Sequence, residues 1–209
     1  RFQEADLKVF SLIAHPRKDS FCHAISELAC TTLQAVGHTI IHHDLYAEEF
    51  DPCLKESEAY TVGDTFEEAL ARSDDPLVQH HRQQIGEAEG ILVVHPNWWG
   101  KPPAILAGWM DRVLVPGVAY RLETADGRPE ALLHLRNAVV FNTSDTEAER
   151  ERLELGDPLQ SIWTQCVLPY CGAKDVQRHV FRPVGGSSEE QRENWFNEVE
   201  ADCQAAFRA

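Results

Sequence analysis

The sequence predicts one α/β domain over residues 1–209: a doubly wound parallel sheet of five strands, in the order 2-1-3-4-5, with helices on both faces. Three observations predict this fold. Short apolar segments alternate with segments of helical period, which is typical of a parallel sheet that is covered on both faces. The chain has no internal repeat and no long linker. Its 209 residues are enough for one large hydrophobic core.

Five segments are expected to form the strands, at residues 9–14, 39–43, 91–94, 138–141 and 176–181. The first, third and fourth are runs of apolar residues, as in buried strands. The polar residues of the second segment predict a position at the edge of the sheet. The last segment is the weakest of the five.

The expected helices carry recognisable start and stop signals. Ser20 is a plausible N-cap for the first helix, and Gly37 is its C-terminal stop. Pro103 suits the first turn of a later helix. Residues 146–149 and 187–190 fit the capping-box pattern. The expected helices are residues 21–36, 66–71, 77–88 and 103–113, and two more that begin at Asp157-Pro158 and after residue 190.

The cysteines favour a cytoplasmic protein with free thiols. They stand at positions 22, 30, 53, 166, 171 and 203, with no CxxC pair and no zinc spacing. Apolar spacing predicts that Cys166 and Cys203 lie on buried helix faces, which favours free thiols, although the even count permits disulfides. The acidic N-terminus lacks the apolar core of a signal peptide, but the missing Met leaves a removed leader open. No segment is apolar for long enough to span a membrane.

The formal net charge of −15 argues against nucleic acid and anionic membranes as partners, because an acidic chain repels both. In a doubly wound sheet, a ligand binds outside the carboxyl ends of the strands, where the strand order reverses. Three loops follow those ends, at residues 15–20, 95–101 and 142–146. The search for functional residues therefore narrows to these loops.

The first loop offers a candidate phosphate site at a helix N-terminus, where free backbone N–H groups favour an anion. Ser20 adds a hydroxyl group, and Arg17 and Lys18 add positive charge. An ordinary polar loop with a serine cap fits equally well, so both interpretations stay open. The chain has no GxGxxG after the first strand and no GxxxxGK[ST], which argues against a dinucleotide-binding Rossmann motif and a P-loop NTPase.

The second loop carries the adjacent Trp98 and Trp99 beside Gly100 and three prolines. Adjacent residues of an extended loop cannot both point into the core, so we expect at least one indole to face the crevice. A flat aromatic ligand would stack on it, and Gly100 would let the backbone approach the ring closely. The alternative is that both indoles cover the core or a subunit interface.

The third loop can bind a polar ring edge or a sugar, but taken alone it is a good helix N-cap. No metal site is expected, because the histidines at 42 and 43 lie on an edge strand and the adjacent His80 and His81 point apart on a helix. A metallo-hydrolase is therefore rejected. The missing GxSxG argues against an α/β-hydrolase.

Three segments resemble the NAD(P)H:quinone oxidoreductase family, whose members have the flavodoxin-like fold and include DT-diaphorase, modulator-of-drug-activity proteins and the ancillary oxidoreductases of potassium-efflux systems. The resemblance covers residues 7–120 well and the rest more loosely. Ala119-Tyr120 falls where the family has an aromatic residue near its active site. The segments are Ala14-His15-Pro16 with Ser20-Phe21; Asp44-Leu45-Tyr46-Ala47 with Phe50-Asp51-Pro52; and, most specific, Pro96-Asn97-Trp98-Trp99 followed by residues 103–113.

The resemblance implies a flavin, FMN or FAD, in the crevice, and the short chain favours FMN. It also implies NAD(P)H as co-substrate and a ping-pong transfer of hydride through the flavin to a quinone-like acceptor. Trp99 and Tyr120 would shape the shared catalytic site. By position, the residues that would hold the flavin are His15, Arg17, Ser20, Phe21 and Cys22 at its phosphate, Pro96, Asn97, Trp98, Trp99 and Gly100 along its ring, and Asn142, Thr143, Ser144 and Asp145 at its polar edge.

The chain departs from the family in three places. Residues 142–145 replace the Thr-Thr-Gly-Gly of many relatives, and Cys22 replaces an Asn. The Tyr and His that relay protons in some relatives are missing between residues 142 and 156. These departures leave the proton route, the exact flavin and the substrate unassigned.

Two further expectations concern partners. We expect a homodimer, as in the family, because Trp98, Trp109 and Tyr120 leave aromatic surface near an open crevice and residues 46–76 form a long excursion. The alternative to a reductase is a flavodoxin-like electron carrier, or a regulatory flavoprotein subunit of a potassium-efflux-type transporter. The acidic charge would suit such a docking protein, whereas the aromatic second loop favours the reductase.

Overall fold

The structure is a computed structural model that describes residues 6–59, 63–122 and 128–208. Its main sheet has five parallel strands in the order β2-β1-β3-β6-β7. Counted within this sheet, the order is 2-1-3-4-5, so the predicted fold class is confirmed. The strands are β1 (Lys8–Ile13), β2 (Thr39–Asp44), β3 (Gly90–Pro96), β6 (Asn137–Thr143) and β7 (Asp175–Phe181).

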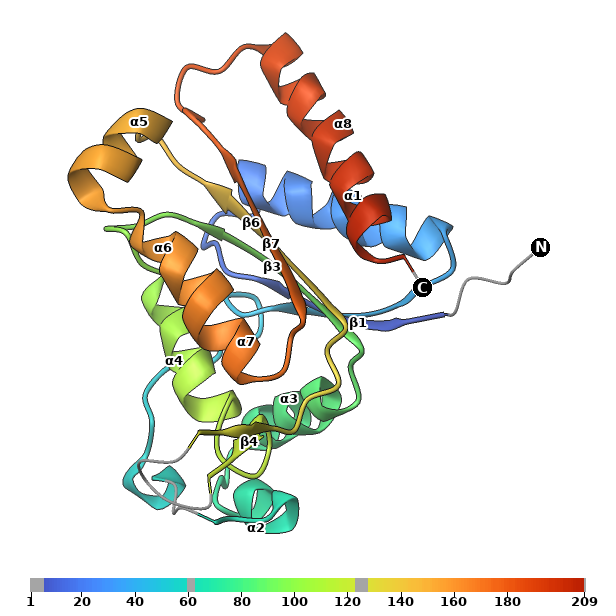
Figure 1. Ribbon diagram of the computed structural model, residues 1–209, viewed down its shortest axis with the longest axis vertical. Helices are drawn as coiled ribbons and strands as arrows, with labels where there is room; N and C mark the ends of the chain where they lie inside the picture. Colours follow the sequence, from blue (N-terminus) through green and yellow to red (C-terminus); the bar gives the residue numbers. More distant parts are fainter. Residues whose placement is uncertain (1–5, 60–62, 123–127, 209) are drawn as a thin grey trace.

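Helices cover both faces of the sheet, with α1 and α8 on one face and α3, α4, α6 and α7 on the other (Figure 1). Successive strand residues therefore enter different cores: Val9 packs on the α1 side and Phe10 on the α4 side. The buried strands are apolar at almost every position because both faces are covered. The helices are α1 (Phe21–Ala35), α3 (Pro76–Gly86), α4 (Ala104–Val113), α6 (Pro158–Ser161), α7 (Leu168–Tyr170) and α8 (Glu189–Ala206).

The predicted start and end of α1 are confirmed. Ser20 is the N-cap, and its Oγ accepts a hydrogen bond from the backbone N–H of His23 at 3.3 Å. Gly37 follows the last turn with a φ of 104°, a left-handed conformation that glycine adopts without steric cost. The short helix α2 (Phe66–Ala71) also forms where the sequence predicts it, with Thr65 as its N-cap.

Three helix starts differ from the prediction. The helix α5 (Ala148–Arg150) begins without a side-chain cap, so the capping box predicted at residues 146–149 is wrong. Instead, Ser144 Oγ accepts a hydrogen bond from the N–H of Thr146 at 3.1 Å. The N-cap of α8 is Ser188, one residue later than the start of the predicted box. Pro103 is the N-cap of α4 and does not lie in its first turn.

Two π-helical stretches, η2 (Glu151–Leu155) and η3 (Ile162–Val167), lie between β6 and β7. A π-helical turn bonds residues five apart, so it rotates the side chains that follow it around the helix axis. Cys166, predicted to be buried, is therefore exposed, whereas Cys203 on α8 is buried as predicted. All six cysteines are free thiols.

Two features around the lower end of α4 are not predicted by the sequence patterns. The strands β4 (Tyr120–Arg121) and β5 (Glu130–Ala131) form a small antiparallel hairpin there (Figure 1). The excursion between β2 and α3 contains a short 3-10 helix, η1 (Glu56–Glu58). A buried ion pair holds it on α4, with Arg112 Nη2 2.6 Å from Glu58 Oε1. None of the helices in the described ranges is both long and apolar enough to cross a membrane.

Candidate functional site

A cavity of about 870 Å³ lies at the carboxyl ends of β1, β3 and β6, where the strand order predicts a ligand. The three loops singled out in the sequence form three of its walls. The chain between β6 and α6 and the loop between β7 and α8 complete it, through residues such as Glu151, Pro158 and Gly185. Its size lies within the range of roughly 300 to 1,000 Å³ that is usual for small-molecule sites.

The five residues predicted to hold the phosphate end of a flavin line this cavity, whereas Lys18, the second cation expected in the first loop, does not. The N-terminus of α1 therefore faces it, together with the Ser20 hydroxyl. The Cys22 thiol lies 3.2 Å from Thr143 Oγ1, and burial raises its pKa to about 11, so the neutral thiol joins the first loop to the third. Burial also lowers the pKa of His15. The lining residues of this loop are His15, Arg17, Ser20, Phe21 and Cys22.

Two residues lie behind Ser20 without lining the cavity, and sequence reasoning missed both. Ser20 Oγ lies 3.0 Å from His23 Nδ1, and His23 Nε2 lies 3.2 Å from Asp44 Oδ2. The spacing of Ser20 and His23 could have revealed the first of these contacts, because residues three apart are neighbours on a helix surface. The array holds the Ser20 hydroxyl at the edge of the cavity.

The second loop forms a tight turn that presents two indoles. The N–H of Lys101 donates to the carbonyl of Trp98 at 3.2 Å, which closes the turn. The two central residues are left-handed, with φ of 60° at Trp99 and 69° at Gly100, the pattern of a type I′ turn. Trp98 is 37% exposed and Trp99 is 96% exposed, and both line the cavity with Pro96 and Asn97. The structure thus places both indoles, and not one alone, at the crevice.

Gly100 is required at its position for two reasons. Its left-handed backbone conformation strains any residue with a Cβ atom. A Cβ atom there would also lie 2.7 Å from Pro158 Cγ. Gly100 therefore lets the turn pack against the start of α6, in addition to lining the cavity.

The third loop divides between the cavity and the core. Thr143, with Ser144 and Asp145, lines the cavity, but Asn142 does not. The strand β6 continues through Thr143, so the side chain of Asn142 points to the opposite face. There its Nδ2 lies 2.9 Å from His95 Nε2, and its Oδ1 accepts a hydrogen bond from Arg178 Nε at 2.6 Å. The expected contact between the Asn142 side chain and a ligand in the cavity is thus not available.

His95 lies below the cavity floor as a neutral imidazole. It is fully buried, and burial lowers its pKa to about 4. Trp163 Nε1 donates to its Nε2 at 2.9 Å, and its Nδ1 lies 2.8 Å from the carbonyl of Pro96. The proton therefore resides on Nδ1, and the ring supports the end of β3 from beneath.

Tyr120, the second residue expected at the catalytic site, does not line the cavity. It begins β4, at the opposite end of α4 from the loop of residues 97–101 (Figure 1). Its ring packs edge-on against Tyr170, with ring centroids 4.8 Å apart. Tyr120 is therefore not placed to contact a ligand in the cavity of its own chain.

Glu151 is a cavity residue that sequence reasoning missed. It is 2% exposed and lines the cavity from the start of η2. Its carboxylate accepts hydrogen bonds from Asn97 Nδ2, at 2.5 Å, and from Arg182 Nη1. No local pattern marked it, because its partners follow two other strands.

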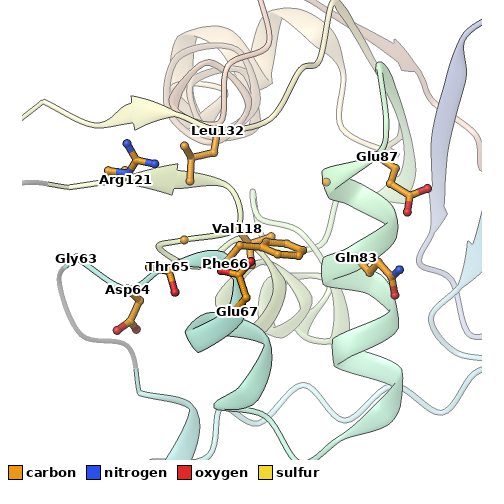
Figure 2. Close-up of a pocket in the computed structure, with 12 residues that line it drawn as sticks. Gly63, Asp64, Thr65, Phe66, Glu67, Gln83, Glu87, Val118, Arg121 and Leu132 are labelled. Carbon is orange, nitrogen blue, oxygen red and sulfur yellow. The ribbon is translucent and has the colours of Figure 1, made fainter.

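A second cavity of about 770 Å³ lies between α2, α3 and the β4–β5 hairpin. Figure 2 shows the Phe66 ring pointing toward α3, which carries Gln83 and ends just before Glu87, with Arg121 on β4 and Leu132 directly after β5. None of its lining residues belongs to the loops at the carboxyl ends of the main strands. It is therefore not the candidate active site.

The structure brings together histidines that the sequence analysis treated separately. His43 Nδ1 lies 2.7 Å from Glu48 Oε1, and His81 Nε2 lies 3.2 Å from Glu48 Oε2. Burial raises the pKa of Glu48, but hydrogen bonds from both histidines outweigh it and hold the pKa at about 2. Trp109 Nε1 donates to His81 Nδ1 at 2.9 Å, so a neutral His81 carries its proton on Nε2, toward Glu48. The ligand atoms of His43, Glu48 and His81 lie within 4.8 Å of one another, close enough to hold a metal ion in place of this proton.

Comparison with known proteins agrees with this arrangement. Residues 7–203 match the protein family described as having the flavodoxin-like fold. Ribosyldihydronicotinamide dehydrogenase (quinone) from Pongo abelii is 29% identical over 203 residues, which cover 90% of this chain and 87% of the relative. The NAD(P)H:quinone oxidoreductase from Methanothermobacter marburgensis has a TM-score of 0.77 at 23% identity, with 96% of each chain covered. An FMN-dependent NADH-azoreductase from Bacillus anthracis, solved in complex with FMN, has a TM-score of 0.72 at 16% identity, over 95% of this chain and 98% of that one.

At these identities, the two solved structures establish a shared fold. The family match extends over nearly the whole chain, and the predicted resemblance to quinone oxidoreductases is confirmed by the names of its relatives. This chain belongs to the family with the flavodoxin-like fold, and it is an oxidoreductase of that family.

Proposed function

We propose that this oxidoreductase binds a flavin, FMN or FAD, in the cavity of about 870 Å³ and uses it to reduce a quinone or a similar acceptor with NAD(P)H. One observation carries the proposal. The turn at residues 98–101 presents two indoles on one wall of the cavity, and the N-terminus of α1 faces the same cavity. A flat aromatic ring with a phosphate tail fits both features.

The residues of the cavity suit the two ends of such a ligand. Ser20 and the free N–H groups of α1 would bind the phosphate, with positive charge from Arg17 and Arg192. Trp99 would lie along the ring, while Thr143 and Asp145 would meet its polar edge. When bound, the flavin would supply two-electron chemistry, accepting hydride from NAD(P)H and passing it to the acceptor in a ping-pong scheme. The protein would bind, orient and shield it.

Two measurements test the proposal against an electron carrier or a transporter subunit. The absorbance spectrum of the purified protein should show flavin bands, and heat release should identify FMN or FAD. Steady-state NAD(P)H oxidation with menadione should then show turnover. Flavin bands without turnover would favour the carrier, and a protein that neither contains nor takes up flavin would overturn the proposal.

Trp99→Ala is expected to weaken flavin binding by about 1 to 3 kcal/mol, by analogy with aromatic stacking on bases. Trp99 is 96% exposed, so its removal should leave the folding stability almost unchanged. Fluorescence titration of the flavin-free protein measures the change. Trp99→Phe keeps an aromatic face and serves as the control. If Trp99→Ala binds flavin as tightly as the parent, the assigned wall is wrong.

We also propose a homodimer in which a second copy closes the cavity. Trp99 and Leu155 line the cavity and are 96% and 55% exposed, which leaves apolar surface at its mouth. Tyr120 lies outside its own cavity and would reach a ligand only in a second copy. Light scattering in dilute, flavin-saturated solution should give a dimeric mass; a monomer with full reductase activity would contradict the dimer.

We also propose a cytoplasmic location, because six free cysteines suit a reducing compartment.

A further inference from the structure

One buried carboxylate joins three loops of the cavity. Asn97 follows β3, Glu151 begins η2 after β6, and Arg182 follows β7. Asn97 Nδ2 donates to Glu151 Oε1 at 2.5 Å, and Arg182 Nη1 donates to Glu151 Oε2. The side chains of Arg182 and Glu151 are only 12% and 2% exposed. Water therefore competes little with this pair.

Glu151 decides which way the amide of Asn97 faces. An ionised carboxylate only accepts hydrogen bonds, so it selects the NH₂ group of Asn97 and turns the amide oxygen the other way. That oxygen accepts a hydrogen bond from the N–H of Gly100 at 2.9 Å. A reversed amide would place its NH₂ group against this N–H, and the bond would be lost.

The hydrogen bond to Gly100 supports a strained turn. Trp99 and Gly100 are both left-handed, with φ of 60° and 69°. For a residue with a side chain, this conformation is sterically unfavourable. Such a conformation persists only where the surrounding structure holds it. Besides the bond from Lys101 to Trp98 that closes the turn, the link from Arg182 through Glu151 to Asn97 is a contact that holds it.

We propose that Glu151 and Arg182 are positioning residues that act through Asn97 to hold Trp99 on the wall of the cavity. The inference deepens the proposed function and rests on it only for the identity of the ligand. The placement of Trp99 itself can be measured without a ligand. Glu151 is not assigned a proton-transfer step, because its carboxylate is engaged by two donors.

The test compares Glu151→Gln with Glu154→Gln in the flavin-free protein. Glu154 lies on the same stretch, but its pair with Arg150 is exposed, with both side chains at 64%. The readout is the Trp99 indole signal in a ¹H–¹⁵N spectrum, identified as the signal missing in Trp99→Phe. We expect Glu151→Gln to shift or broaden this signal and Glu154→Gln to leave it unchanged. FMN titration should show about tenfold or greater weakening for Glu151→Gln alone.

A second variant keeps the inference falsifiable if Glu151→Gln folds poorly. Asn97→Ser removes the amide and keeps both charges of the Glu151–Arg182 pair, and it should perturb the same Trp99 signal. If Glu151 acts through Asn97, adding Glu151→Gln to Asn97→Ser should change the signal and the FMN affinity little further. Additive effects would overturn the inference, as would a Trp99 signal that neither single variant moves. If the variants perturb the Trp99 signal but the parent protein binds no flavin, the proposed function is overturned and the positioning role still stands.

Discussion

Replacing Arg112 with alanine is expected to lower the free energy of unfolding by about 3 to 5 kcal/mol, because Glu58 would become a buried charge without its partner. Both side chains are 1% exposed, and Arg112 Nε and Nη2 donate to the Glu58 carboxylate at 2.8 and 2.6 Å. Arg112 also donates to the carbonyl of Asp51, so one guanidinium holds two parts of the excursion on α4. Urea denaturation followed by circular dichroism measures the loss.

Arg121→Ala is the matched control for this substitution. Arg121 lies 3.1 Å from Glu130, but their side chains are 53% and 63% exposed. An exposed pair of this kind contributes about 1 kcal/mol or less. Similar losses in the free energy of unfolding for the two variants would show that the buried Arg112–Glu58 pair stabilises the fold no more than an exposed pair does.

The same ion pair makes stability depend on pH in the acid range. Burial raises the pKa of Glu58, but hydrogen bonds from Arg112 and Ser73 outweigh it and hold the pKa at about 2, below the usual 4.5. A depressed carboxyl pKa contributes stability above the unfolded-state value, and this contribution is lost as the pH falls toward the folded-state value. Arg112→Ala should therefore reduce the loss of stability between pH 4.5 and 2.

Gly108→Ala is expected to destabilise the protein by about 3 kcal/mol, at the upper end of the usual cost of overpacking. A Cβ atom at this position would lie 2.1 Å from the carbonyl oxygen of Pro52 and 2.4 Å from its Cβ. Backbone must move to make room, and α4 begins directly after the turn that carries Trp99. Thermal unfolding should show the loss of stability, and flavin titration should show weaker binding.

Gly86→Ala provides a control with the same chemical change and the opposite expected sign. The nearest atom to a Cβ at Gly86 is Phe66 Cε2 at 3.8 Å, an ordinary contact. Alanine restricts the unfolded chain and favours a helix, so this variant should be neutral or up to about 1 kcal/mol more stable. If Gly108→Ala proves equally mild, α4 does not need its close approach to Pro52.

The doubly wound parallel sheet was predictable because its alternation of strands and helices depends on local patterns repeated along the chain. Apolar runs at residues 91–94 and 138–141 can only be buried on both faces, and the helical segments between the runs require parallel crossover connections. Ser20 and Gly37 were predictable for a similar reason, since a cap acts within one turn of its helix. The loops at the carboxyl ends of the strands, and Trp99 among them, follow from the same alternation.

The orientation of Asn142 is a feature that local sequence patterns did not predict. The apolar run ends at residue 141, but β6 pairs with its neighbours through Thr143. Two more residues of strand put Asn142 on the core side and Thr143 on the cavity side, because successive side chains alternate. Cys166 is similar, since a π-helical turn that no apolar spacing revealed moved it to the surface.

The sequence by itself determined the alternation of strands and helices in a parallel sheet, the three loops that could hold a ligand and the aromatic character of one of them. Only the tertiary structure decided that Asn97 meets Glu151, that Glu151 meets Arg182, and that Tyr120 lies far from the cavity it was expected to shape. The physical reason is the separation along the sequence between the residues that interact. Helix caps and apolar periods depend on residues within a few positions, whereas a buried carboxylate finds its partners through the combined geometry of three loops, which no local pattern encodes.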